Sequence, residues 1–244
     1  MTDLHTHILP GMDDGPKDLE TARQLLALQA NQGVKRIALT SHFDPEGETA
    51  EDFLCRRDRA FDALRAVCPE GMTLKLGCEV YFSPMLLSLD AQRLCLEGTS
   101  LLLLELPVLQ KPAFLQEVLS GLCNRGITPL IAHAERYQYV RRNPGILAQW
   151  KALGAVIQLS SGAVKDDTLT RKMVKWGLAD VLASDAHSPQ YRPPNLKVGL
   201  NAVRGSSGAE LAGIVQRNAD LLFSGAAIPK RRVHVPKKVL GLWL

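Results

Sequence analysis

The sequence predicts an α/β protein built from βα units around a parallel sheet. Short apolar segments alternate with longer segments whose apolar residues recur every three or four positions. This is the pattern of strands that alternate with helices. A length of 244 residues fits one domain of the α/β-barrel kind or two small domains. Because the chain contains no internal repeat or low-complexity linker, we predict one domain over residues 1–223 and a C-terminal tail over residues 224–244.

Seven apolar segments are the candidate strands: Asp3–His7, Arg36–Ser41, Leu74–Val80, Ser100–Leu106, Pro129–His133, Val156–Ser160 and Asp180–Ser184. The helical segments between them include Leu19–Gln32, Ala50–Val67, Pro112–Asn124, Pro144–Leu153, Asp167–Trp176 and Ala209–Phe223. The first helix shows the reasoning, because its apolar residues form one stripe at spacings of three and four. Pro16 is placed to open this helix and Gly33 to end it.

The composition is that of an ordinary globular protein. Hydrophobic residues make up 46% and charged residues 22% of the chain, which excludes a disordered, fibrous or multi-spanning membrane protein. The N-terminus lacks the basic and apolar regions of a signal peptide, and no apolar run reaches the ~18 residues of a membrane span. The five cysteines are scattered, with no CxxC pair, and no Arg follows any of them by six residues. We therefore expect reduced thiols, a cytoplasmic location and no cysteine-phosphatase chemistry.

The net charge of +4 is concentrated at the C-terminus. Five cations lie in the last fifteen residues, so the remainder has 24 cations against 25 acids and no broad basic face for nucleic acid. These five are Lys230, Arg231, Arg232, Lys237 and Lys238. The tail ends in an apolar segment that contains Trp243. It is either a disordered or surface-packed terminus, or a segment that contacts a kinase or a membrane surface.

Five of the six histidines fall at the ends of predicted strands. His5 and His7 share one face of the first strand, because side chains in a strand alternate between faces. Asp185 and His187 share a face after the seventh strand by the same rule. The other two follow strand two and end strand five: His42 and His133.

Carboxylates occur at the same level of the predicted sheet. Asp14 follows strand one, Glu79 ends strand three, and Glu105 is the only charge in strand four. In a parallel barrel the C-terminal strand ends meet at one face, where active sites are built. Nine candidate metal ligands would then converge there: His5, His7, Asp14, His42, Glu79, Glu105, His133, Asp185 and His187. Imidazole and carboxylate without thiolate suit Mn²⁺, Fe²⁺ or Zn²⁺, and nine ligands are too many for one ion, whereas three ions that share carboxylates use them all.

Two arginines are candidates for binding an anion beside these ligands. Arg136 follows His133 by three residues, and Arg192 follows His187 by five. A guanidinium at either position would hold phosphate oxygens in a bidentate fork. The alternative for each is a surface arginine or, for Arg136, a salt bridge to Glu135.

These residues resemble the polymerase-and-histidinol-phosphatase family of metal hydrolases, whose characteristic pairs are matched by His5-x-His7 and Asp185-x-His187. Within that family, the sequence is similar to the bacterial protein-tyrosine phosphatases of capsular and exopolysaccharide gene clusters. The segments that carry the resemblance are collinear and span nearly the whole chain: residues 3–16, 41–42, 77–80, 104–107, 132–136, 160–162 and 183–187.

The resemblance implies a distorted (β/α)₇ barrel with three divalent ions, most often Mn²⁺. It implies that His5, His7, Glu79 and Asp185 hold the first ion, that Glu79, Glu105 and His133 hold the second, and that Asp14, His42 and His187 hold the third. It also implies a substrate, phosphotyrosine on a bacterial tyrosine autokinase that controls polysaccharide export.

The mechanism we predict is a single in-line displacement. Adjacent ions lower the pKa of a water they share, and the resulting hydroxide attacks phosphorus. The third ion, Arg136 and Arg192 stabilise the equatorial oxygens as charge develops. Tyrosinate is a fair leaving group, since the pKa of tyrosine is near ~10, and no general acid is assigned.

Three other functions are open to this sequence. The first is a histidinol-phosphate or other small phosphomonoester phosphatase. Glu105 stands at a ligand position where a His is commonly found in those enzymes, and this difference favours the tyrosine-phosphatase branch. The second is a phosphodiesterase or nuclease, which the near-neutral body disfavours. The third is a non-catalytic module that binds a kinase or membrane through its tail, although a costly polar cluster of this kind has no evident packing value.

Overall fold

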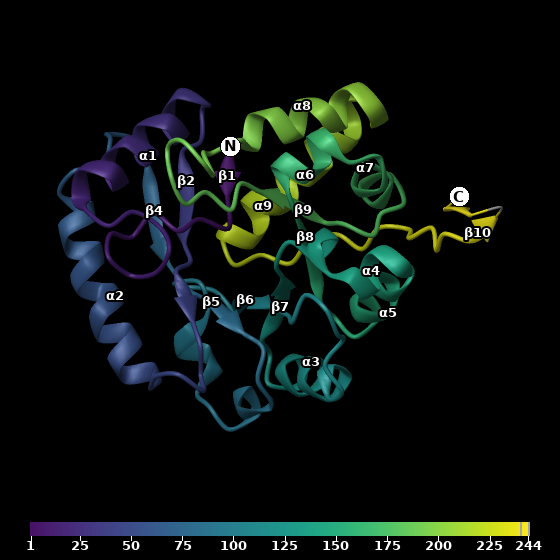
Figure 1. The fold of residues 1–244 in the computed structure, drawn as a ribbon, viewed down its shortest axis with the longest axis horizontal. Coiled ribbons are helices and arrows are strands. Elements are labelled where there is room, and N and C mark those ends of the chain that lie inside the picture. The colour runs from purple at the N-terminus through teal and green to yellow at the C-terminus, as the bar shows by residue number, and fades with distance from the viewer. Residues whose placement is uncertain (240, 244) are drawn as a thin grey trace.

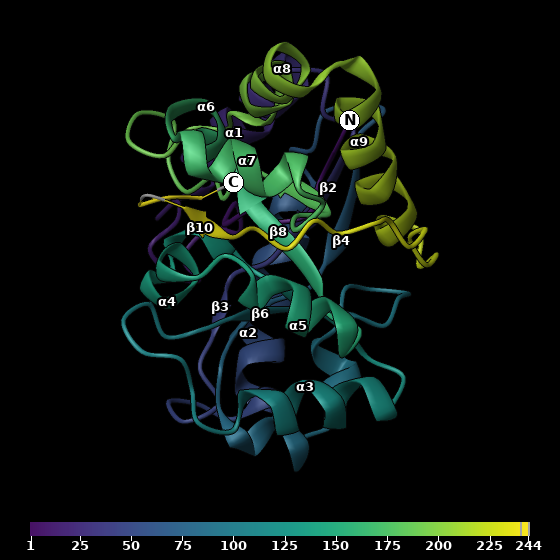
Figure 2. The same cartoon turned by 90° about the vertical axis from the view of Figure 1, so that its right-hand side faces the viewer.

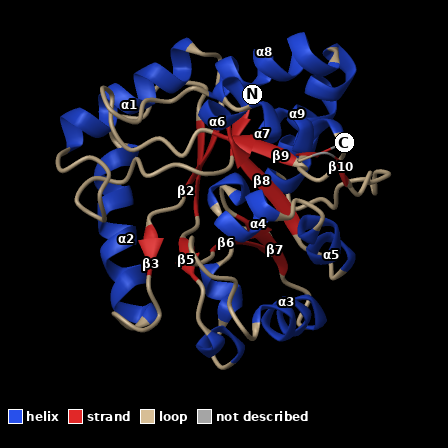
Figure 3. Cartoon of the chain, turned by 45° about the vertical axis from the view of Figure 1, so that its right-hand side comes forward, coloured by secondary structure: helices blue, strands red, loops and turns tan. Residues whose placement is uncertain are grey.

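The structure is a computed structural model that describes residues 1–239 and 241–243 (Figure 1). Parallel strands occupy its centre and helices surround them, as the colouring by secondary structure shows in Figure 3. Leu240 and Leu244 of the predicted tail lie outside the described residues.

The strands form two parallel sheets. The first has the order β1-β2-β4 and the second β3-β5-β6-β7-β8-β9. β3 follows β2 after a break of two residues, and β5 follows β4 in the same way, so the sheets are the lower and upper parts of one seven-stranded arrangement. The strands are Thr2–Asp3 (β1), Arg36–Leu39 (β2), His42–Phe43 (β3), Thr73–Leu76 (β4), Glu79–Tyr81 (β5), Leu101–Glu105 (β6), Thr128–Ile131 (β7), Val156–Ser160 (β8) and Val181–Ala183 (β9).

The first and last strand segments meet through one isolated parallel bridge between Thr6 and Ala186. The His7 amide donates to the Ala186 carbonyl at 2.9 Å, and the Asp185 amide donates to the His5 carbonyl at 3.0 Å. This contact brings the two ends of the strand order together, as in the predicted distorted barrel. It lies beyond the ends of β1 and β9 and consists of a single bridge, whereas the other neighbouring strands pair through ladders.

Helices cover the outside of the strands. They are α1 (Leu19–Asn31), α2 (Ala50–Arg65), α3 (Leu115–Asn124), α4 (Gln138–Arg142), α5 (Ile146–Ala152), α6 (Ser161–Asp166), α7 (Thr168–Lys175), α8 (Leu196–Ser207) and α9 (Ala209–Phe223), with 3₁₀ turns at Pro84–Leu87, Ala91–Leu94 and Ala134–Arg136. α1 begins one residue after Asp18, whose carboxylate accepts from the Thr21 amide at 2.7 Å as an N-cap. Gly33 follows its end with φ +84°, in the left-handed region that glycine tolerates.

Several predicted elements need correction. The predicted strand Arg36–Ser41 ends at Leu39, and an unpredicted strand follows it at His42–Phe43. Leu74–Val80 divides into β4 and β5, and Asp3–His7 is a strand only at its start. α3 begins at Leu115, three residues after the predicted proline start. α8 is absent from the predicted helices, because its glycine, asparagine and serine residues depress helix propensity. Its apolar face, rather than propensity, stabilises it: Leu196, Leu200 and Val203 are buried.

The strand alternation separates two apolar layers and sets the direction of the polar residues above them. On β6, Leu101 and Leu103 face the barrel interior, whereas Leu102 and Leu104 pack under the helices. Continuing the alternation, Glu105 points inward at the C-terminal end of β6. On β8, Val156 belongs to the inner layer, so Gln158 and Ser160 also point inward. The interior is therefore apolar at its base and polar at its mouth.

The tail is packed on the barrel as far as it is described. After α9 it crosses the barrel base and then runs between α5 and α7, as Figure 2 shows in yellow. The His234 amide donates to the Trp176 carbonyl at 2.8 Å, and Val233 and Trp243 pack against the main core. Its end forms a short antiparallel pair, β10 (Lys238–Val239) with β11 (Leu242–Trp243). A search of the described residues finds no helix long and apolar enough to span a bilayer.

A close approach between α8 and the start of α6 yields a stability prediction. A Cβ at Gly199 would lie 2.7 Å from the Cα and Cβ of Ser161, whereas a Cβ at Gly205 of the same helix meets open space. We expect Gly199→Ala to lower the free energy of unfolding by about 1–3 kcal/mol through overpacking. Gly205→Ala, the matched control, should be neutral or stabilising by up to about 1 kcal/mol. Urea denaturation of both variants checks this, and equal stabilities would contradict the close packing.

Candidate metal centre

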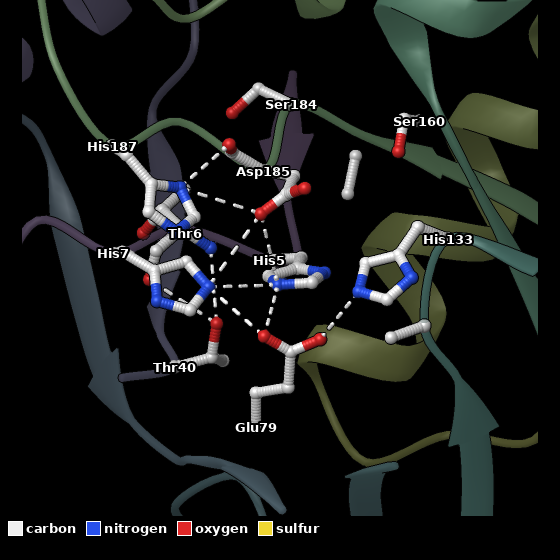
Figure 4. Close-up of polar contacts among 12 residues, drawn as sticks. His5, Thr6, His7, Thr40, Glu79, His133, Ser160, Ser184, Asp185 and His187 are labelled. Atoms are coloured by element: carbon white, nitrogen blue, oxygen red, sulfur yellow. Dashed lines mark hydrogen bonds and ion pairs between the residues drawn. The ribbon is translucent and has the colours of Figure 1, made fainter. Parts of the chain in front are cut away.

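A buried carboxylate forms the middle of the candidate site. Glu79, at the start of β5, is 1% exposed and is surrounded by imidazoles from three other strand segments (Figure 4). Its Oε2 lies 3.0 Å from His5 Nε2 and 3.1 Å from His7 Nε2, and its Oε1 lies 2.9 Å from His133 Nε2. The two nitrogens His5 Nε2 and His7 Nε2 face each other at 3.0 Å. Each of these atoms therefore points at a common volume beside the carboxylate.

Asp185 closes this group from the other side, through the barrel junction. Its Oδ1 lies 3.4 Å from His5 Nε2, 3.6 Å from His7 Nε2 and 3.5 Å from His187 Nδ1. Asp185 has φ +54° and His133 has φ +27°, both unusual for residues other than glycine. Backbone strain of this kind costs about 1–3 kcal/mol and concentrates at functional sites. Two of the predicted ligands therefore hold their side chains in place at a conformational cost.

A third group lies nearer the solvent. His187 Nε2 is 3.1 Å and His42 Nε2 3.6 Å from Asp14 Oδ1. Asp14 is 61% exposed and His42 38% exposed, whereas His187 is buried. The remaining carboxylate, Glu105, brings Oε1 to 3.4 Å from His133 Nε2 and Oε2 to 3.7 Å from His42 Nδ1. All nine predicted ligands thus lie in one connected cluster at the mouth.

The cluster divides into groups whose ligand atoms lie within 4.8 Å of one another. One contains His5, His7 and Asp185. The others are His7, Asp14, His42 and His187, and His42, Glu79 and Glu105. The grouping resembles the division that the family resemblance implies, with differences: His7 and His42 are each shared between groups, Glu79 is grouped with His42 instead of with His5, and His133 is in none of the three groups. The geometry thus favours ligands held in common over three separate sets.

Two residues that the sequence analysis did not assign fix the imidazole orientations. Asp13 Oδ2 lies 2.8 Å from His7 Nδ1 and accepts from the His42 amide at 2.9 Å. Gln158 Oε1 lies 3.2 Å from His5 Nδ1 and accepts from the His133 amide at 2.7 Å. Both contacts leave the Nε2 atoms of His5 and His7 turned to the cluster. The inward alternation on β8 is the signal in the sequence that would have found Gln158.

The two predicted arginines meet at one carboxylate oxygen. Arg136 Nη2 and Arg192 Nη2 both donate to Asp185 Oδ2, the second at 2.7 Å. Arg136 therefore pairs with Asp185 and not with Glu135, the alternative that the sequence left open. The two guanidiniums line a pocket of about 390 Å³ with Ser160, Ser184 and the exposed Tyr191. This pocket opens beside the cluster.

Electrostatics keep the inner carboxylates ionised. Burial raises the pKa of Glu79, but the His5 charge and the hydrogen bond from His133 outweigh it and hold that pKa well below its usual range. Burial lowers the pKa of His7, yet its hydrogen bonds to Asp13 and Glu79 raise it to about 10. By contrast, burial and the His7 charge lower the pKa of His187 to about 4. Burial and Glu79 raise the pKa of Glu105.

The donor set fits divalent cations. Asp185 Oδ1 is buried and accepts no hydrogen bond from any described residue, although three imidazole nitrogens face it. A buried carboxylate oxygen left without a donor is costly, and a shared cation would satisfy it. The cluster offers imidazole nitrogen and carboxylate oxygen without thiolate, the set that suits Mn²⁺, Fe²⁺ and Zn²⁺.

The α/β fold and this cluster together fit one class of protein, the metal-dependent hydrolases of the α/β-barrel kind. A family model for capsular polysaccharide synthesis proteins, CpsB/CapC, matches residues 1–224. The chain therefore belongs to the CpsB/CapC family, which confirms its resemblance to phosphatases of capsular gene clusters.

Relatives of known name are tyrosine phosphatases. The chain is 28% identical to the tyrosine-protein phosphatase YwqE of Bacillus subtilis over 93% of each chain. It is 29% identical to the tyrosine-protein phosphatase CpsB of Streptococcus pneumoniae, over 87% of this chain and 93% of that protein. One crystal structure from the pair YwqE and CpsB, described as unique metal-dependent tyrosine phosphatases, superposes with a TM-score of 0.88 at 26% identity, covering 97% of this chain and all of the other. An amidohydrolase of Mycoplasma synoviae shares the fold alone, with a TM-score of 0.53 at 11% identity over 96% of this chain and 90% of its own.

The contacts of Asp13 predict a loss of metal affinity on its substitution. We expect Asp13→Asn to weaken Mn²⁺ binding by about 10–100-fold, because an outer carboxylate orients a ligating histidine and raises its basicity. Competition with a chromogenic chelator measures this. Asp62→Asn, at an exposed position on α2, removes the same charge away from the site and should leave affinity unchanged. A change of less than about twofold in Asp13→Asn would contradict the positioning role.

The raised pKa of His7 predicts proton release on metal loading. At neutral pH the metal-free protein holds His7 protonated, and a metal ligand must be neutral. Mn²⁺ binding should therefore release protons at pH 7, and apparent affinity should rise by about tenfold per pH unit for each displaced proton, up to the pKa of about 10.

Rising pH has the opposite effect on the folding stability of the metal-free protein, which it lowers. A raised histidine pKa contributes stability that is full below the unfolded value near 6.5 and is lost as pH rises through about 10. The gap in stability between loaded and metal-free protein should then widen from pH 7 to pH 10. An indicator dye in weak buffer reports the protons, with His7→Asn as the variant that releases fewer. Binding without proton release at pH 7 would refute the protonated state.

Proposed function

We propose that this protein is a metal-dependent protein-tyrosine phosphatase whose ligands are the nine clustered residues and whose phosphate-binding groups are Arg136 and Arg192. The observation that carries the proposal is the pair of guanidiniums converging on Asp185 Oδ2, at the boundary between the ligand cluster and an open pocket. This arrangement places anion-binding groups directly beside candidate metal ligands. The names of its relatives agree with it.

The two parts of the site have separate tasks. Divalent ions, with Mn²⁺ the first choice and three the proposed number, would activate water and polarise phosphate oxygens when bound. The protein's own groups orient the substrate: Arg136 and Arg192 would bind its phosphate oxygens beside the ligand cluster. Tyr191, 92% exposed on the pocket rim, leaves room for a substrate attached to a polypeptide.

The proposed substrate is a phosphotyrosine segment of a bacterial tyrosine kinase of a capsule or exopolysaccharide system. The S. pneumoniae relative is a tyrosine-protein phosphatase, and the family is one of capsular polysaccharide synthesis. The five cysteines are free thiols, which is consistent with action in the reducing cytoplasm. We also propose that the basic tail contacts a component of that system or the membrane beside it.

The first experiment is phosphate release from a phosphotyrosine peptide. Metal-free protein should regain activity with Mn²⁺, and the double variant His5→Ala/His7→Ala should not. A phosphoserine peptide, histidinol phosphate and single-stranded DNA serve as competing substrates. Preference for histidinol phosphate would move the proposal to the small-molecule phosphatases, and inactivity of verified Mn²⁺-loaded protein on phosphotyrosine would reject it.

The arginines predict a specific kinetic defect. We expect Arg192→Lys and Arg136→Lys each to lower kcat/KM for the peptide by about 10²-fold, because a lysine cannot reproduce the bidentate fork and one oxyanion donor is lost. Arg141→Lys is the matched control, because Arg141 lines the same pocket but pairs with Asp167 at 2.8 Å. Mn²⁺ affinity measured alongside separates phosphate binding from metal loading. Unchanged kcat/KM in both arginine variants would remove them from the site.

A further inference from the structure

Two stretches of the chain that lie far apart in sequence contain cations but no acids. The first covers residues 168–179 and includes α7, with Arg171, Lys172 and Lys175. The second covers residues 221–244 and includes the tail. In the sequence these are two separate and modest charge excesses. Only the fold decides whether they act together.

The fold joins them into one surface. Arg231 Nη2 donates to the carbonyls of Val174 and Lys175 at 3.3 Å, at the C-terminal end of α7. Lys172 Nζ donates to the Trp243 carbonyl at 2.8 Å, which ties the terminal strand pair to the same helix. Figure 2 shows the tail running beside α7 along one wall of the barrel.

Burial raises the pKa of Asp180 and the Arg231 charge acts against that rise, but the carboxylates around this wall pair directly with other residues. None of its cations forms an ion pair within the part of the chain that the structure describes. The acids that border the wall already have partners: Asp167 pairs with Arg141, Asp180 with Lys151, and Asp166 lies 3.7 Å from Lys165. The cations are Arg171, Lys172, Lys175, Lys230, Arg231, Arg232, Lys237 and Lys238, which we call the basic wall.

Aromatic and apolar groups lie among these cations. Lys238 Nζ lies 5.7 Å from the Trp243 ring centroid, and Lys172 Nζ lies 5.9 Å from that of Trp176. Val235 is 54% and Val239 48% exposed. Tryptophan and lysine side by side are typical of segments that lie at a membrane interface, where the ring sits among headgroups and the ammonium meets lipid phosphate.

We propose that the basic wall docks this protein on an anionic lipid bilayer. The occupant follows from the chemistry: the cations of the wall complement anionic headgroups, and the exposed Val235 and Val239 enter the interface. The charge also comes from two segments that hydrogen bonds from Arg231 and Lys172 hold side by side. The proposal extends the suggested role of the tail and does not depend on phosphatase activity, since lipid binding is measured without a substrate.

The test is co-sedimentation of the full chain with vesicles. The expected result is binding to phosphatidylcholine vesicles with about 30% phosphatidylglycerol, no binding to pure phosphatidylcholine, and release when salt rises from about 0.1 M to about 0.5 M. Lys175→Gln and Lys237→Gln, one from each segment, should each lower the partition coefficient by about fivefold and together by about 25-fold. Both side chains are exposed and lie outside the proposed catalytic groups.

The matched control removes two charges from another wall. Arg59→Gln/Arg65→Gln lies on α2, which Figure 1 places on the opposite side of the barrel from the tail, and it should bind vesicles as the native chain does. Equal loss in this control would mean that only net charge matters and would overturn the proposal. So would absence of binding to the anionic vesicles by the native chain. An effect of Lys237→Gln without one of Lys175→Gln would overturn the two-segment surface.

Discussion

The burial of Glu79 is the constraint on which the site depends. A carboxylate that is 1% exposed is unstable unless several donors or cations compensate for its lost hydration. The compensating imidazoles come from strand segments one, two and five, so these three segments must end at the same level of the sheet for all of them to reach Glu79. His42 pairs with Glu79 directly in the β3–β5 register, which means that the break before β5 is what brings the two side chains level. The register of β3 on β5 thus places an imidazole beside the buried carboxylate.

Two of the candidate ligands have strained backbone conformations, which neighbouring interactions stabilise. The left-handed conformations of His133 and Asp185 are each followed by tight local structure, a 3₁₀ turn after the first and the barrel junction after the second. Asp3 reinforces the junction: buried beneath it, its carboxylate accepts from the Ser184 amide at 2.9 Å and from Gln29 at 2.7 Å. A strained residue persists when its neighbours over-determine it. The segments that follow β1 and β9 share only one bridge, but the side-chain hydrogen bonds of Asp3 hold this junction in place.

The positions of the candidate ligands could be predicted from the sequence where strand alternation determines which way a side chain points, and not where a loop or tertiary packing determines it. Strand alternation places His5 with His7 and Glu105 above Leu103, and the structure brings all nine candidate ligands together. Alternation says nothing in the loop after the first strand, so it does not distinguish Asp13, which turns inward to His7, from Asp14, which is largely exposed. Gln158 was missed because a neutral amide inside an apolar strand carries no obvious chemistry until its two donors are known. α8 was missed because tertiary packing outweighs its poor propensity.

Charge balance links the ligand cluster to the arginines. Four of the nine candidate ligands are carboxylates, and at neutral pH they surround the volume where a phosphate would enter. Both guanidiniums donate to Asp185 Oδ2, and in the metal-free protein the raised pKa of His7 adds a further positive charge beside the carboxylates. Divalent ions would displace that proton, and each would add two positive charges among the carboxylates. The proposed ions would therefore supply most of the positive charge that a phosphate meets, and the two arginines would add directional hydrogen bonds to its oxygens.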